Sequence, residues 1–147
     1  MIKHILIPTD GSEQSQRAAV QGVALAKALG AKVTGFFAAP PATPIVYRHH
    51  LPVGLAQPAE HDEMIEKAAA EYLGFIERTA TEAGVEYEGV HKTDDFAAHA
   101  ILDMADKKGC DLIVMGKHSH GRLHDLFIGS VTHKVVHQAK LPVMVIH

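Results

Sequence analysis

Cysteine, positive charge and long apolar runs are all scarce in this sequence, and each scarcity excludes a class of protein. Cys110 is the one cysteine among 147 residues, so no disulfide can form within the chain. Lys and Arg number 14 against 17 Asp and Glu, and the net charge is −3. The basic excess that is typical of nucleic-acid-binding and membrane-surface proteins is therefore missing. We expect a protein of the reducing cytoplasm, with neither nucleic acid nor membrane as a partner.

No stretch of the sequence has the character of a membrane span or a leader. The longest uncharged stretch, Val33 to Tyr47, is interrupted by prolines and falls short of the roughly 20 apolar residues that cross a bilayer. The first ten residues hold a short apolar patch without a cleavage-like tail, which argues against a signal peptide. Hydrophobic residues make up 47% and charged residues 21%, as in ordinary globular proteins. The length and the absence of internal repeats predict a single domain over residues 1–147.

Apolar periodicity predicts five strands that alternate with four helices. The expected strands cover residues 2–7, 32–38, 85–92, 112–115 and 141–146. The expected helices cover residues 12–29 and 60–83, a segment from Asp94 or Asp95 to Lys108, and a segment from Gly129 or Ser130 to Ala139. Pro8 should stop the first strand, and Gly30 should end the first helix in a left-handed conformation. Because crossovers between parallel strands are right-handed, this order predicts an α/β fold, a three-layer doubly wound sandwich with a parallel sheet.

A proline-rich segment separates the second strand from the second helix. Five of the seven prolines lie between Pro40 and Pro58, which excludes regular structure there. Long loops in compact proteins are commonly functional. This 40–58 loop is either a lid over a site at the carboxyl end of the strand or a surface excursion, and the sequence leaves both open.

The segment between the fourth strand and the last helix carries the clearest functional signal. Ligands of doubly wound sheets bind beyond the carboxyl ends of the strands, where the winding reverses. The segment leaves a buried strand at Gly116 and returns at Gly129 and Ser130 to a helix start, whose free N–H groups and dipole favour an anion. In between it carries Lys117, His118, His120, Arg122 and His124. This arrangement indicates a phosphate cradle, with an ordinary Gly-Ser helix start as the alternative.

Asp10, which follows the first strand, is the second candidate. It could accept a hydrogen bond from a base or sugar, hold a metal-bound water, or cap the first helix. The cluster of His118, His120 and His124 invites a metal site, but no cysteine or acidic cluster of metal-site spacing accompanies it, and we predict none. His133 and His137 are expected to be exposed.

Enzymatic signatures are missing from the sequence. It contains no GxSxG, GxxxxGK(S/T) or GxGxxG pattern. Cys110 has no base beside it in the sequence. We therefore predict no catalytic residue, and slow ATP hydrolysis at most.

Four segments together resemble one known family. They are Ile-Leu-Ile-Pro-Thr-Asp-Gly-Ser over residues 5–12, Asp-Leu-Ile-Val-Met-Gly over residues 111–116, Gly-Ser-Val-Thr over residues 129–132, and Leu-Pro-Val-Met-Val-Ile over residues 141–146. In order and spacing the chain resembles the universal stress protein family over nearly all of its length. The resemblance implies a five-stranded sheet of order 3-2-1-4-5 and a homodimer joined through the strand at 141–146.

The resemblance also implies an adenine nucleotide, ATP or AMP, with Mg²⁺ as an optional companion. The nucleotide-binding branch of the family carries a GxxGx9G(S/T) pattern, which here falls on Gly116, Ser119, Gly129 and Ser130. By resemblance, Pro8, Thr9, Asp10 and Ala38 would line the adenine and ribose. By the same resemblance, the ribose and phosphates would be surrounded by Met115, Gly116, His118, Ser119, Gly129, Ser130, Val131 and Thr132.

Ser119 stands where the pattern has its second glycine. If that position needs a left-handed backbone, a serine costs about 1–2 kcal/mol, which weakens binding rather than abolishing it. Two functions remain, a stress-response module regulated by an adenine nucleotide and a dimeric interaction module without one. The substitution Ser119→Gly discriminates between them, because it raises affinity only in a working pocket. A phosphoacceptor signalling domain would need a Lys after the last strand, and none follows.

Overall fold

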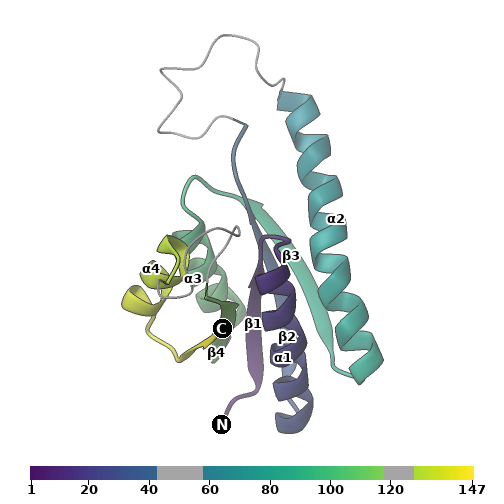
Figure 1. Cartoon of the computed structure of the whole chain (residues 1–147), viewed down its shortest axis with the longest axis vertical. Coiled ribbons are helices and arrows are strands. Elements are labelled where there is room, and N and C mark those ends of the chain that lie inside the picture. Colours follow the sequence, from purple (N-terminus) through teal and green to yellow (C-terminus); the bar gives the residue numbers. More distant parts are fainter. Residues whose placement is uncertain (43–57, 118–127) are drawn as a thin grey trace.

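Five parallel strands form one sheet, in the order β3-β2-β1-β4-β5 (Figure 1). The computed structural model describes residues 1–42, 58–117 and 128–147. The strands are β1 (His4–Thr9), β2 (Lys32–Ala39), β3 (Tyr87–Thr93), β4 (Leu112–Gly116) and β5 (Val143–Ile146). The helices are α1 (Glu13–Leu29), α2 (Pro58–Ala83), α3 (Ala97–Lys108) and α4 (Ser130–Gln138). The predicted α/β sandwich with strand order 3-2-1-4-5 is confirmed.

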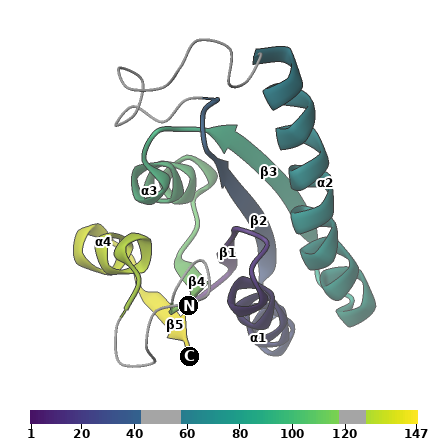
Figure 2. The ribbon, with the colours of Figure 1, turned by 45° about the horizontal axis from the view of Figure 1, so that its top comes forward.

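The helices cover the two faces of the sheet in pairs, α1 and α2 on one face and α3 and α4 on the other (Figure 2). Successive side chains of a strand point to opposite faces. Ile5 and Ile7 accordingly pack with Val23 of α1 and Ile76 of α2, whereas Leu6 packs against the α3 and α4 side. All six residues of β1 are buried. Each fully buried Ile or Leu contributes about 1.5–3 kcal/mol, so the central strand anchors both cores.

The end of β1 corrects one prediction, because the strand continues through Pro8 to Thr9. On the β2 side Pro8 is in register with Phe36. The even-numbered residues of β1 direct their backbone polar groups toward β4, since the His4 carbonyl accepts from the Asp111 N–H at 2.9 Å. The ladder with β4 reaches only Leu6, which is paired with Ile113. Pro8 has no N–H with which to extend that ladder, whereas the pairing with β2 is carried by the odd-numbered residues and continues to Thr9.

Several element boundaries also differ from the predicted ones. The N-cap of α3 is Phe96 rather than Asp94 or Asp95. Asp94 instead accepts the N–H of Phe96 itself, at 2.8 Å. Strand β3 starts at Tyr87 because the Val85 N–H donates to the Ala80 carbonyl and so closes α2. Gly30 ends α1 with φ 67° in the left-handed region, as predicted.

Three further boundaries move by a short distance. Strand β5 starts at Val143, and Leu141 before it packs among the side chains between the sheet and the α3 and α4 pair. Helix α4 ends at Gln138, and Ala139 has already returned to extended backbone. Helix α2 begins at Pro58, earlier than predicted, which suits a residue whose fixed φ and missing N–H are tolerated in a first turn.

Whether the 40–58 loop is a lid or a surface excursion depends on residues 43–57, which lie outside the described residues. Among the described helices, none combines the length and the apolar character that crossing a bilayer requires.

Candidate functional site

A cavity of about 500 Å³ opens at the carboxyl edge of the sheet. The ends of β1, β2 and β4 form its floor, and α2, α3 and α4 supply side chains around it. The lining is mostly apolar, and it comprises Pro8, Thr9, Asp10, Ser15, Phe37, Ala38, Pro40, Pro41, His61, Met64, Ile65, Ala68, Tyr72, Asp94, Asp95, Ala97, Ile101, Met115, Gly116, Val131 and Thr132. This is the edge of the sheet at which doubly wound folds bind ligands.

The turn from β1 into α1 is held by its own side chains. Ser12 caps α1 by accepting the Ser15 N–H at 3.2 Å, and the Ser15 hydroxyl lies 3.1 Å from that of Thr9. Asp10 accepts the Ser12 N–H at 3.0 Å, and the Thr9 hydroxyl accepts the Gly11 N–H at 3.1 Å. The polar groups of this turn are therefore used largely within the turn.

Gly11 connects this turn to α2. Its φ of 79° lies in the left-handed region, and a Cβ placed on it would lie 2.3 Å from the Tyr72 ring. The Tyr72 ring meets Phe37 edge to face, with 5.2 Å between ring centroids. The glycine thus lets an aromatic side chain of α2 close over the turn and form one wall of the cavity.

The start of α4 is built differently from the start of α1. Gly129 is its N-cap, and within the described part of the chain no side chain caps the first turn. The Gly129 N–H donates to the Lys117 carbonyl at 2.9 Å, which brings the two ends of the 118–127 segment together. The Thr132 hydroxyl donates to the Gly116 carbonyl at 2.9 Å and fixes α4 against the end of β4.

Gly116 is needed for a close approach rather than for an unusual backbone. A Cβ at Gly116 would lie 3.2 Å from the backbone oxygen of Gln14, so a side chain there would press tightly against the first turn of α1. Gly129 has φ −61° and ψ 155°, which any residue adopts. Neither glycine has a positive φ, and the positive-φ glycines of the described chain are Gly11, Gly30, Gly84 and Gly109.

The structure brings eight of the twelve predicted site residues to this cavity. They are Pro8, Thr9, Asp10, Ala38, Met115, Gly116, Val131 and Thr132. Gly129 and Ser130 stand at the start of α4, the first buried and the second exposed, and neither belongs to the lining. His118 and Ser119, together with His120, Arg122 and His124, lie outside the described residues. Lys117 uses its backbone to bridge β5 and α4 and does not line the cavity.

Sequence reasoning missed the contribution of α2 and the two carboxylates that follow β3. Helix α2 supplies lining residues, and their spacing in the sequence indicates only a buried helical face. They are His61, Met64, Ile65, Ala68 and Tyr72. Asp94 and Asp95 could have been found, because they follow a strand at the same edge of a parallel sheet. They had been interpreted only as helix caps.

Among the described residues, metal and nucleophile chemistry find little support. In residues 1–42, 58–117 and 128–147 no three His, Cys, Asp or Glu side chains converge as metal ligands. His133 and His137 are exposed, with parallel rings 6.3 Å apart on α4. Burial, with a smaller effect from Asp111, raises the pKa of the Cys110 thiol to about 11, so the thiolate is scarce at neutral pH.

Comparison with known proteins places this architecture in a family. The model of the universal stress protein family matches residues 1–147. The chain belongs to the universal stress protein family. Its resemblance to that family, first seen in four short segments, is confirmed over the full sequence.

Relatives of known sequence and structure agree with this assignment. The universal stress protein YxiE of Bacillus subtilis is 32% identical, over 99% of each chain. A universal stress protein solved in complex with cAMP matches with a TM-score of 0.69 and 22% identity, over 99% of this chain and 97% of that chain. The universal stress protein of Archaeoglobus fulgidus in complex with dAMP matches with a TM-score of 0.68 and 20% identity, over 100% and 98%. At these identities the two solved structures support the shared fold.

Proposed function

We propose that this universal stress protein binds an adenine nucleotide in the cavity at the carboxyl edge of its sheet. In this proposal the occupied cavity regulates a stress response by changing the surface that the protein presents to partners. The cavity volume of about 500 Å³ lies within the range of small-molecule sites, and the mostly apolar lining suits an aromatic base.

The residues around the cavity fit the parts of a nucleotide. Pro8 and Ala38 offer apolar surface to the adenine, and Asp10 offers a carboxylate to a base amine or a ribose hydroxyl. Val131 and Thr132 lie in the first turn of α4, whose N–H groups lack acceptors within the helix. A phosphate at that turn would receive these N–H groups as donors and would be favoured by the helix dipole.

One observation carries the proposal. The N-terminus of α4, which no described side chain caps, adjoins a cavity large enough for a nucleotide, whereas α1 at the same edge is capped by Ser12. N–H groups at a helix start are costly when they are shielded from water without a partner, so an anionic ligand in an adjoining cavity is a natural partner for them. The cAMP and dAMP complexes of the two structural neighbours support an adenosine monophosphate as that ligand.

Titration calorimetry of the purified protein with AMP, cAMP and ATP tests the proposal. We expect binding at submillimolar concentrations and a loss of about tenfold or more in Ala38→Leu, which adds side-chain volume to the cavity wall. The matched control is Ala24→Leu, which adds the same carbons on the exposed face of α1. Absence of heat with all three nucleotides at millimolar concentration would contradict the proposal and favour the dimeric module without a nucleotide.

We also propose that two copies pair through β5. This strand lies at the edge of the sheet, and Met144 within it is 41% exposed. Unpaired edges with apolar side chains favour association with another strand. Light scattering should give the mass of a dimer, and Met144→Lys should shift the protein toward the monomer. A monomeric parent protein would contradict this second proposal.

A further inference from the structure

The cavity has two sides, because the strands that form its floor direct successive side chains to opposite faces of the sheet. Ala38 and Met115 point to the face that α3 and α4 cover, and this α3 side of the cavity is the one assigned to the nucleotide. Phe37, which precedes Ala38, points to the face that α2 covers and packs with residues of that helix. The proposed function gives this second side, the α2 side, no ligand.

The α2 side exists because α2 extends beyond the sheet (Figure 1). Helix α2 has 26 residues and is about 39 Å long, whereas the 8 residues of β2 span about 26 Å. The last turn of α2 lies at the amino edge of the sheet, because β3 begins soon after the helix ends. The first turns therefore project past the carboxyl edge and line the cavity with one stripe of the helix. This stripe consists of His61, Met64, Ile65, Ala68 and Tyr72.

Two aromatic rings form the centre of the α2 side. Tyr72 meets Phe37 edge to face, with 5.2 Å between the ring centroids, and Ile65 and Ala68 pack beside them. Gly11 gives the Tyr72 ring this position, since its φ of 79° and its missing side chain leave space that a Cβ would enter at 2.3 Å from the ring. Tyr72, Ile65 and Ala68 are only half-buried, so part of their apolar surface faces the cavity.

Polar groups at the border of the α2 side are bonded within the protein. The Thr9 hydroxyl lies 3.1 Å from the Ser15 hydroxyl, below the Tyr72 ring in the turn from β1 to α1. The Nε2 of His61 lies 2.9 Å from the Pro40 carbonyl oxygen, a contact that ties the start of α2 to the end of β2. The surface between these two contacts is supplied by apolar and aromatic side chains.

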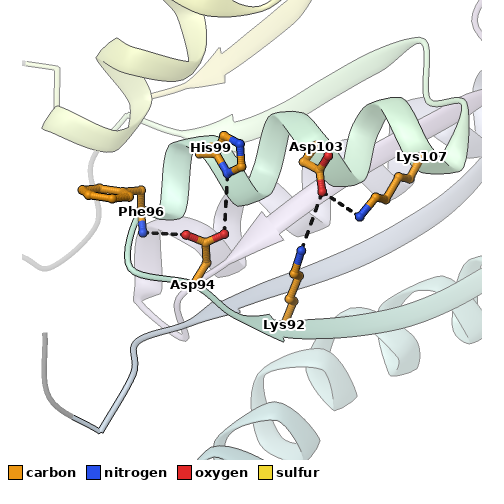
Figure 3. A network of polar contacts seen from close by, with 6 residues as sticks. All are labelled: Lys92, Asp94, Phe96, His99, Asp103 and Lys107. Carbon is orange, nitrogen blue, oxygen red and sulfur yellow. Dashed lines mark hydrogen bonds and ion pairs between the residues drawn. The ribbon is translucent and has the colours of Figure 1, made fainter. Parts of the chain in front are cut away.

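The α3 side carries a fixed polar group instead (Figure 3). The Oδ1 of Asp94 accepts the Phe96 N–H at 2.8 Å, and its Oδ2 lies 3.6 Å from Nδ1 of His99, on the first turn of α3. Asp94 lines the cavity, with its side chain 18% exposed. The two sides of one cavity therefore present different chemistry, a carboxylate acceptor on one and an aromatic surface on the other.

We propose that the α2 side is a separate subsite, which binds a small neutral aromatic molecule beside the nucleotide. The inference goes beyond the proposed function and does not depend on it. A ring on this side gains from burial against apolar side chains and from edge or face contacts with Phe37 and Tyr72. Transfer of a charge from water to such a surface is costly, which favours a neutral ligand. Because the ends of the strands stand between the two sides, an occupied α2 side leaves the α3 side open.

Toluene is a suitable probe, and an NMR titration of the isotope-labelled parent protein tests the inference without a nucleotide. We expect saturable binding with a Kd of about 1 mM or lower. The amide signals of Phe37, Ala68 and Tyr72 should shift most, whereas AMP should shift those of Val131 and Thr132. Saturation with AMP should change the toluene affinity by no more than about threefold. Toluene that does not bind, that shifts mainly the start of α4, or that AMP displaces overturns the inference.

Three matched variants separate the two sides. Ala68→Leu adds volume to the α2 side and should lower toluene affinity about tenfold or more, while AMP affinity stays within about threefold. Ala38→Leu should do the opposite. Ala70→Leu adds the same carbons on the exposed face of α2, outside this cavity, and should leave both ligands unaffected. Equal toluene affinities in Ala68→Leu and Ala70→Leu would contradict the inference. Absence of nucleotide binding with toluene still bound would overturn the proposed function alone.

Discussion

The first turns of α1 and α4, which both begin at the carboxyl edge of the sheet, are built in opposite ways. At α1 the side chains of Ser12, Asp10 and Thr9 accept backbone N–H groups of the turn. At α4 the N-cap is Gly129, and no described side chain accepts a first-turn N–H. Both turns border the same cavity. The backbone N–H groups of the α1 turn are bonded within the protein, whereas those of the first turn of α4 are left to bind a ligand.

This difference separates stability from binding in a way that substitutions can measure. Changes at Gly11 and Ser12 of the β1–α1 turn, which do not line the cavity, should cost folding free energy and affect ligand affinity little. Changes at the start of α4 should lower ligand affinity and affect folding free energy little. The first three changes below each alter one of the two turns, from the largest expected effect to the smallest.

Gly11→Ala should be the most damaging change. A Cβ at this position would meet the Tyr72 ring at 2.3 Å, and φ 79° is unfavourable for alanine. We expect a loss of about 3 kcal/mol in the free energy of unfolding, as the sum of backbone strain and overpacking. Gly30→Ala is the control for strain alone, because φ is 67° there and no other atom lies within 4 Å. Equal losses in urea denaturation would show that Tyr72 does not press on the turn.

Ser130→Pro addresses the other side of the comparison. Proline suits the first position of a helix, and the extended backbone of Gly129 before it is compatible with proline. The variant should keep its stability but lose one N–H, so that AMP affinity falls about tenfold while adenosine affinity is unchanged. Ser130→Ala removes the hydroxyl and keeps the N–H. If both variants bind AMP like the parent, the first turn of α4 is not the phosphate site.

Ser12→Ala gives the counterpart at α1. It removes the oxygen that accepts the Ser15 N–H, and loss of such a cap costs about 1 kcal/mol. Thermal denaturation should show the lower stability, whereas AMP affinity should change by no more than about twofold. A large loss of affinity at unchanged stability would mean that the two turns do not divide their roles as described.

The smallest effect should come from a histidine that lies at the opposite edge of the sheet from both turns. Burial, assisted by the charge of Lys32, lowers the pKa of His4 below its ordinary value of 6.5, and its Nε2 lies 2.7 Å from the Thr34 hydroxyl. The unfolded chain then binds the proton more readily than the folded one. Stability should be full above pH 6.5 and should decline as the pH falls below it, until the folded protein also takes up the proton.

His4→Gln should reduce this pH dependence. Urea midpoints measured between pH 7.5 and pH 5 in both proteins provide the test. The same slope in parent and variant would assign the effect to other groups.

The fold could be predicted closely because its signals are local. Gly30 marks the end of a helix through its left-handed backbone, and the run Leu112–Met115 marks a strand covered on both faces. Pro8 misled because its missing N–H faces β4 and leaves the pairing with β2 intact, which no local pattern records. Phe96 replaced the expected aspartates as N-cap, since Asp94 serves the start of the helix from two positions earlier by accepting the Phe96 N–H.

The candidate site was predictable only where it uses consecutive residues. Segments at the ends of β1 and β4 carry recognisable turns, and their residues line the cavity as expected. Tyr72 and His61 reach the cavity from α2, more than 50 residues after β1. The apolar periodicity of α2 in the sequence resembles that of any amphipathic helix. Only the packing of α2 over the turn at Gly11 brings them there.

The contact between Gly11 and Tyr72 also gives the protein an optical reporter. The sequence has no tryptophan and three tyrosines, so near-ultraviolet emission of the chain is tyrosine emission. Of these, Tyr87 is tied to the Leu73 carbonyl between α2 and the sheet, whereas Tyr72 faces the cavity. A molecule that enters the cavity therefore touches an intrinsic fluorophore, and occupancy can be followed on the unlabelled chain.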